Sequence, residues 1–403
     1  MDERAALAAR APALVAAPNL LLGLSGAALA EKQAMLAGDA HVFFRGTPAL
    51  FVDDMQGPCA SLLELADRRA PRTDVLVDFH LGNLGTFAAP DGRVVWGPND
   101  FDQAAPGAPE LDLLRGATSL FLLGQANDVP ARTTRRAVRR LLSAYADELA
   151  RLTRHGGGPR PTPALTPGEV DGCLRGLLTR AADQAKESRQ LGVPVARYVD
   201  PKSPDRLRRS NDVVNVDATW QRELELGLAA AFPGVRVLDV AERLHAGGSS
   251  RGLPRALALV EQGGVRHVLE LKRAPPSPLD GPGASFDAAQ VVARQRAMAG
   301  AIVSPWLRAA SIGGRSFLVR EVDAEKASLD LTRLGKGDLD DVAKAAGVAL
   351  ARVHGHDPAV CRALHQWLGR DVDEIAHRLE KNAGRYARVV EAEHQAWRQS
   401  LGA

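Results

Sequence analysis

Cysteine is scarce in this chain: among 403 residues there are only Cys59, Cys173 and Cys361. Their number is odd and they lie far apart in the sequence. This excludes a disulfide framework and argues against a zinc site built on paired cysteines. Such a chain fits a reducing compartment, and we therefore expect a cytoplasmic protein.

The chain also lacks a long uninterrupted hydrophobic run. The most apolar stretch near its start, residues 13–30, is broken by Pro18 and Asn19. The segment before it carries acidic residues as well as arginines, which argues against a secretory signal peptide. The stretch is also too interrupted to span a bilayer, so we expect no membrane association.

The chain also has no large excess of positively or negatively charged residues. The 51 Lys and Arg residues are nearly balanced by 48 Asp and Glu, which gives a formal net charge of +3. Two local basic runs, at 132–140 and 206–212, lie beside expected helices, where solvated charged faces are the usual explanation. We expect no nucleic-acid partner.

The composition is that of a globular protein, with 45% hydrophobic and 25% charged residues. A chain of this length is expected to form two lobes or two domains. Glycine and proline concentrate at 154–168, which predicts an exposed linker after a first unit at 1–153. The remainder is expected to divide into a helical connection, a small β-rich unit and a final helical segment, at 169–232, 233–322 and 323–403.

Polar side chains cluster after two short apolar strands. In "VDFHLGN", Asp78, His80 and Asn83 fall within six residues of one another. Further on, "NDFD" places Asp100 and Asp102 after the apolar "VVW". Asp and Asn oxygens are hard metal ligands, and a carboxylate can orient a hydroxyl, so the set suits magnesium-assisted phosphoryl transfer. The alternative is that the aspartates cap turns and His80 supports the loop, but two such loops in succession favour a functional interpretation.

The second half contains a strand, a glycine loop, a second strand, a two-glycine turn at 263–264, and a third strand that ends on Lys272. In the loop, Gly247 and Gly252 allow the backbone to approach an anion closely, and Ser250 lies between them. A glycine loop between strands is often only a turn. The lysine on the next-but-one strand favours phosphate binding instead.

Two further groups are weaker candidates. His354 and His356 are close enough in sequence to share a metal ion, but no third ligand lies nearby, and histidines at a helix C-terminus are the simpler explanation. Ser249 and Ser250 lack the motif that surrounds a catalytic serine. We assign neither pair to catalysis.

Several long motifs in a fixed order make the chain resemble a bacterial family of unknown function, DUF2252, which is itself similar to aminoglycoside phosphotransferases and other kinase-like enzymes. The resemblance is carried by "KQAMLAGDAHVFFRGT", "VDFHLGNLGTF", "GRVVWGPNDFDQAAPGAPELDLLRGATSL", "AGGSSRGLPRALALVEQ", "LELKRAPPSPL", "VVARQRAM", "FLVREV" and "ALARVHGH". It implies an α+β, bilobal protein-kinase-like fold. Because the catalytic-loop and metal-loop motifs here precede the glycine loop and the lysine, it also implies a circular permutation.

The resemblance implies roles for the candidate residues. Asp78, with His80 beside it, would be the catalytic base, and Lys272 would bind the phosphates of ATP. Residues of the loop above the nucleotide would be Gly247, Ser250 and Gly252. Magnesium ligands would be Asn83, Asp100 and Asp102. Structural roles are expected for Arg45, Asp112 and Arg115.

The leading hypothesis is an ATP- and magnesium-dependent phosphotransferase that acts on an unidentified small-molecule or peptide hydroxyl. The helix expected at 286–301 contains no glutamate to pair with Lys272, and Ser249 stands where a glycine is usual. Both departures favour an alternative, a catalytically inactive nucleotide-binding pseudokinase that acts through a protein partner. A nucleotidyl transferase that moves AMP to a protein is a further alternative. The chain also departs from the family pattern at Val77, Gly82 and Arg273.

Overall fold

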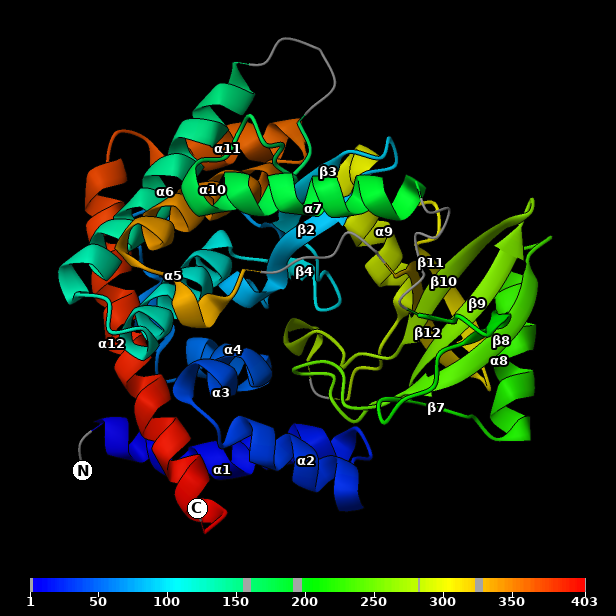
Figure 1. Cartoon of the computed structure of the whole chain (residues 1–403). Helices are drawn as coiled ribbons and strands as arrows, with labels where there is room; N and C mark the ends of the chain where they lie inside the picture. Colours follow the sequence, from blue (N-terminus) through cyan, green and yellow to red (C-terminus); the bar gives the residue numbers. More distant parts are fainter. Residues whose placement is uncertain (1–2, 155–160, 191–197, 282, 323–328, 403) are drawn as a thin grey trace.

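The computed structural model describes residues 3–154, 161–190, 198–281, 283–322 and 329–402. They form a helix-rich part and a β-rich part that lie beside each other (Figure 1). The helices of the first part are α1 (Glu3–Leu21), α2 (Gly26–Leu36), α3 (Ala40–Gly46), α4 (Pro48–Gln56), α5 (Pro109–Ala126), α6 (Ala131–Thr153), α7 (Gly172–Gln190), α10 (Lys336–His354), α11 (Pro358–Leu368) and α12 (Val372–Ser400). Its short strands are β1 (Thr73–Val75), β2 (Leu84–Ala88), β3 (Val94–Pro98) and β4 (Ala105–Gly107).

The β-rich part is built on a six-stranded antiparallel sheet with the strand order β11-β12-β10-β9-β8-β7. Its strands are β7 (Val213–Val214), β8 (Arg236–Arg243), β9 (Arg255–Gln262), β10 (Val265–Lys272), β11 (Arg308–Ile312) and β12 (Arg315–Glu321), and its helices are α8 (Ala218–Ala231) and α9 (Ala288–Ala299). A separate pair, β5 (Val199–Asp200) and β6 (Ser203–Leu207), lies next to it. The two-glycine turns at 263–264 and 313–314 close the β9–β10 and β11–β12 hairpins, which confirms the expected strand order.

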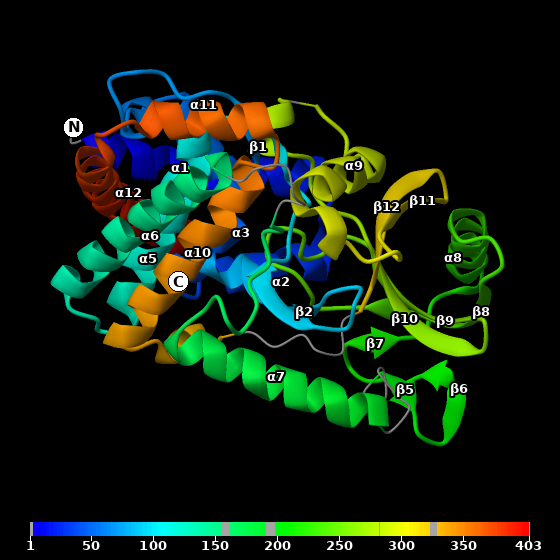
Figure 2. The same ribbon diagram turned by 90° about the horizontal axis from the view of Figure 1, so that it is seen from above.

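The two faces of this sheet differ in chemistry. Alternation along β12 sends Phe317 and Val319 to the face covered by α8, and Leu318 and Arg320 to the other face. Figure 2 shows α8 on the side of the sheet that points away from the helix-rich part. The opposite face carries the charged residues of β9, β10 and β12, so charged side chains are presented toward the helix-rich part.

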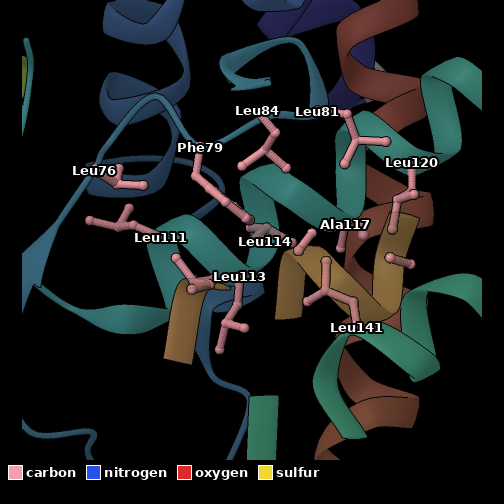
Figure 3. Packing of buried hydrophobic residues seen from close by; sticks show 14 of the residues in the cluster. Leu76, Phe79, Leu81, Leu84, Leu111, Leu113, Leu114, Ala117, Leu120 and Leu141 are labelled. Carbon is pink, nitrogen blue, oxygen red and sulfur yellow. The ribbon is translucent and has the colours of Figure 1, made fainter. Parts of the chain in front are cut away.

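The loop that follows β1 is tied to the helical core by its own apolar residues. Phe79, Leu81 and Leu84 alternate with the polar candidates and are buried against α5, as Figure 3 shows. Helix α5 begins at Pro109, which suits a first helical position. It is buried on nearly every side, so the loop rests on a rigid support.

The basic run at 132–140 lies on α6, and its arginines are exposed while Val138 and Leu141 are buried. This confirms the prediction that the run at 132–140 is a solvent-exposed charged face of a helix. The run at 206–212 lies on β6 and the following loop, not beside a helix.

Helices α6 and α10 pack closely against each other at Gly347. A Cβ at this position would overlap the Leu141 carbonyl oxygen and lie 3.1 Å from the Tyr145 backbone nitrogen. We expect Gly347→Ala to lower the free energy of unfolding by about 1–3 kcal/mol, because backbone atoms cannot move aside as a side chain can. Urea-induced unfolding followed by circular dichroism measures the change.

Gly337 provides the matched control, since it lies on the same helix and a Cβ there meets nothing within 4 Å. Gly337→Ala should leave stability unchanged or raise it by up to about 1 kcal/mol through helix propensity. Equal effects of the two substitutions would contradict the assigned α6–α10 contact.

The structure is a mixed α+β fold, as expected, and no described helix is long and apolar enough to cross a membrane. Part of the expected linker at 154–168 lies outside the described residues. In its described part, Leu165 is fully buried and its backbone pairs with that of Trp96 on β3. Residues 163–165 are therefore packed, whereas Pro167 and Gly168 are exposed. The expected helical connection at 169–232 also contains β5, β6 and β7.

Candidate functional site

A cavity of about 720 Å³ lies between the two parts and is lined by residues from both. Seven of the predicted site residues line it: Asp78, His80, Asn83, Asp100, Gly247, Ser250 and Lys272. Two do not. Asp102 lies behind Lys272, and Gly252 packs toward Leu24 and Ala28 at the start of the chain.

Asp112 on α5 holds the backbone from which the candidate base projects. Its carboxylate accepts hydrogen bonds from the Leu76 and Val77 amides at 2.6 and 2.8 Å and lies 3.1 Å from His354 Nε2. Val77 has a φ of 66°, a left-handed conformation that is strained for a β-branched residue. Two hydrogen bonds from one buried carboxylate keep the chain in this conformation. His354 is thus a structural residue, as the sequence indicated.

Asp78 is held by Arg115, which lies one turn further along α5. Arg115 Nε and Nη2 donate to Asp78 Oδ1 at 3.0 and 2.5 Å. The guanidinium is fully buried and stacks over the Phe44 ring at 4.3 Å, so it is fixed. Burial raises the pKa of Asp78, and Arg115 opposes part of this rise. Asn83 Nδ2 donates to the Asp78 carbonyl oxygen at 3.0 Å and lies 3.3 Å from Oδ2.

His80 supports the loop from inside. Its Nδ1 accepts a hydrogen bond from the Gly82 amide at 3.0 Å, and its Nε2 lies 3.6 Å from Asp78 Oδ1. Burial, together with Arg45 and Arg115, holds the pKa of His80 well below its usual range and so favours the neutral ring. The geometry favours a supporting role for His80 over proton transfer to the substrate.

Lys272 at the end of β10 is buried and bound by two carboxylates from the other part. Its Nζ lies 2.5 Å from Asp102 Oδ2 and 3.8 Å from Asp100 Oδ1. Burial alone would raise the pKa of Asp100, but Lys272 and Arg320 outweigh it and lower that pKa. Burial and repulsion from Asp100 raise the pKa of Asp102. Asp100 is the carboxylate that faces the cavity.

The carboxylate that pairs with Lys272 does not come from helix α9, in which no glutamate was expected. Asp287 caps α9, because its Oδ1 accepts from the Ala289 and Gln290 amides at 2.9 and 3.3 Å. The carboxylate that pairs with Lys272 is Asp102, which comes 170 residues earlier in the chain. The partner therefore comes from the loop after β3 and not from a helix of the β-rich part.

Glu270 forms a charged cluster that the sequence analysis missed. It lies two residues before Lys272, on the same face of β10, and its carboxylate binds Arg243, Arg255 and Arg320 at 2.8, 3.0 and 2.7 Å. Burial would raise the pKa of Glu270, but these arginines hold it well below the usual range. Strand alternation from Lys272 could have revealed Glu270, whereas its three partners depend on sheet register.

The glycine loop between β8 and β9 is held by α2. Glu31 lies 2.6 Å from His245 and also binds Arg251, and Lys32 donates to the Ser249 carbonyl. Inside the loop, Ser250 Oγ accepts from Arg255 Nη2 at 2.9 Å, and Gly247 adopts a φ of 95°. The left-handed φ explains why glycine is needed there.

The described part of the chain contains no preformed cluster of metal ligands. Among the described residues, no group of three or more His, Cys, Asp and Glu side chains has the arrangement of a metal site. Asn83 and Asp100 are nevertheless two hard oxygen donors on the wall of one cavity. This pair suits an ion that also takes ligand oxygens and water.

Comparison with protein families and known structures gives one informative result. A family model described as "Uncharacterized protein conserved in bacteria (DUF2252)" matches residues 26–400. No curated protein and no solved structure matches the chain. The matched range includes every residue of the cavity that is named above.

Proposed function

The chain belongs to the DUF2252 family of proteins conserved in bacteria, and we propose that its central cavity binds ATP with magnesium and transfers the γ-phosphoryl group to an acceptor hydroxyl. One observation carries the proposal. The cavity collects Asp78, Asn83 and Asp100 from the helix-rich part and the glycine loop and Lys272 from the β-rich part. These residue types match the base, the metal ligands and the phosphate-binding groups that phosphoryl transfer requires.

In this proposal Asp78 is the group that orients the acceptor. Its Oδ1 accepts two hydrogen bonds from Arg115, whereas Oδ2 accepts only a longer one from Asn83 at 3.3 Å. Oδ2 is therefore the oxygen that would meet the hydroxyl. The hydroxyl oxygen forms a bond to the γ-phosphorus, and its proton passes to Asp78. The bond from that phosphorus to the bridging oxygen breaks, and ADP leaves with the electron pair. Positioning and charge stabilisation supply most of the rate acceleration in such a reaction.

Asn83 and Asp100 are the residues that would hold magnesium, which would neutralise phosphate oxygens when bound. Asp102 is left out of this set because its carboxylate binds Lys272. When phosphates enter, Lys272 can turn from the two aspartates toward them. The loop amides between Gly247 and Ser250 would face the same phosphates.

The finer description of the fold is also part of the proposal. We infer a bilobal kinase-like fold, because one sheet carries a glycine loop, then a strand lysine, then a helix, in the order expected. In this chain these elements follow the loops at 78–102, so the order is circularly permuted. Permutation requires that the first and last elements lie close together, and α1 packs against α12. Figure 1 shows both helices in the helix-rich part.

One observation favours a second function, an inactive nucleotide-binding protein that signals through a partner. Asp78 is paired with a buried arginine and Lys272 with a buried aspartate, so both key groups are already neutralised. A site of this kind can bind a nucleotide without turning it over. Binding and turnover must therefore be measured separately.

The test of the nucleotide site is unfolding with and without ATP and magnesium. At a ligand concentration one hundred times its dissociation constant, we expect about 2.7 kcal/mol of added stability. Lys272→Met should remove most of this gain. Lys344→Met is the control, because that lysine forms only a surface pair with Asp171. No gain for the wild-type protein at millimolar ATP would refute the proposal.

A further inference from the structure

The charge of the cavity wall exceeds what its own carboxylates neutralise. Seven Arg and Lys residues line the cavity against four Asp and Glu, an excess of three positive charges. Most of the cations are already paired: Glu270 binds Arg243, Arg255 and Arg320, Asp102 binds Lys272, and Glu31 binds Arg251. The two that remain without a carboxylate partner among the described residues are Arg45 and Arg208.

Arg45 is the inner of these two and lies beside the candidate base. It projects from the last turn of α3, and its guanidinium lies against Gly82, where a Cβ would come within 2.7–3.0 Å of its atoms. The absence of a side chain at Gly82 therefore makes room for the arginine. Arg208, in contrast, is exposed and lies at the rim.

None of the described residues supplies an acceptor for the buried Nε donor of Arg45. Its Nε is shielded from solvent and forms no hydrogen bond with a described residue. Burial lowers the pKa of Arg45, and Asp78 and Asp39 oppose this without forming an ion pair with it. A buried donor without an acceptor is costly, and such groups are usually satisfied by another side chain, water or a ligand.

Because Arg115 already neutralises Asp78, the positive charge of Arg45 is available to bind an anionic group of a ligand. A guanidinium binds phosphate or carboxylate through two parallel hydrogen bonds. We propose that the acceptor carries its own anionic group, a phosphate or a carboxylate, and that Arg45 binds this group while the acceptor hydroxyl faces Asp78. This inference rests on the proposed phosphotransfer function and adds the chemical class of the acceptor.

The test uses the full chain with the nucleotide site filled by magnesium and a non-hydrolysable ATP analogue. Inorganic phosphate and acetate are titrated as probes of the anion subsite by isothermal calorimetry. We expect saturable binding of at least one probe to the wild type and a loss of about tenfold or more in Arg45→Met. The probe that binds tells a phosphate subsite from a carboxylate subsite. Arg45→Lys should retain part of the affinity because it keeps the charge, and Arg208→Met should leave it unchanged.

Three outcomes would overturn the inference: no saturable binding of either probe, equal binding in the wild type and Arg45→Met, or an equal loss of nucleotide affinity in Arg45→Met. The last outcome would make Arg45 a ligand of the nucleotide phosphates. Failure of the nucleotide itself to bind refutes the proposed function instead. In that case the same titrations of the empty cavity, with Lys272→Met beside Arg45→Met, still show which cation binds the anion.

Discussion

Asp100→Asn is expected to abolish the effect of magnesium on ATP binding and to lower turnover by about 10²–10³-fold or more. Asp100 is the one carboxylate of the 78–102 segment, apart from Asp78, that faces the cavity. Asparagine keeps the shape of the side chain but removes the charge that a magnesium ion requires. Lys272 retains Asp102 as its partner, so the site should stay folded.

The measurement is the dissociation constant of ATP with excess magnesium and with EDTA, by calorimetry. For the wild type we expect clearly tighter binding with magnesium, and for Asp100→Asn a ratio near one. Asp212→Asn is the matched control, because Asp212 also lines the cavity but is exposed and forms no ion pair with a described residue. A variant that kept the full magnesium effect would show that Asp100 does not hold the metal.

Asp78→Asn is expected to lower ADP formation by about 10²–10⁴-fold while the ATP dissociation constant changes less than about threefold. The carboxylate acts on the acceptor hydroxyl, not on the bound nucleotide. The same change should also lower stability, because Arg115 is fully buried and loses its counter-charge. Breaking a buried pair costs about 3–5 kcal/mol, and the remaining amide oxygen, which still accepts from Arg115, keeps the loss toward the low end.

Turnover is measured as the ADP that forms from ATP in the presence of magnesium. The acceptors are a panel of small hydroxyl compounds, and water serves as a slow acceptor. Stability is followed by urea unfolding, so the two effects are separated. If the wild type binds ATP but forms no ADP with any acceptor, and Asp78→Asn changes only stability, the inactive nucleotide-binding protein is the correct function. If Asp78→Asn keeps full turnover, the base is another residue.

Local parts of the site could be predicted from the sequence because they depend on neighbouring residues. Two local patterns specify turns: the spacing of Asp78 and Asn83 within one loop, and the glycines at 247 and 263–264. These turns depend on neighbouring residues and not on tertiary contacts. The helix cap at Asp287 is a local feature of the same kind. Each of these features involves hydrogen bonds over a few residues.

The partners of the charged groups could not be predicted. The kinase-like pattern places a carboxylate partner for Lys272 on the following helix, whereas in the structure the partner is Asp102 from the helix-rich part. Arg45 and Arg115 were expected to be structural. In the structure Arg115 fixes the candidate base, and Arg45 lies in the cavity without an ion pair to a described residue.

The sequence by itself determined the family, the α+β class, the hairpins, and the residue types of the two polar loops and the glycine loop. These features follow from local periodicity, turn chemistry and motif order. The tertiary structure alone decided which loops share a cavity, which carboxylate neutralises which cation, and which cation is left over. Those outcomes depend on strand register, on the packing of α2 and α3 at the cavity, and on the support that α5 gives to the Asp78 loop. A linear pattern of charges specifies none of them.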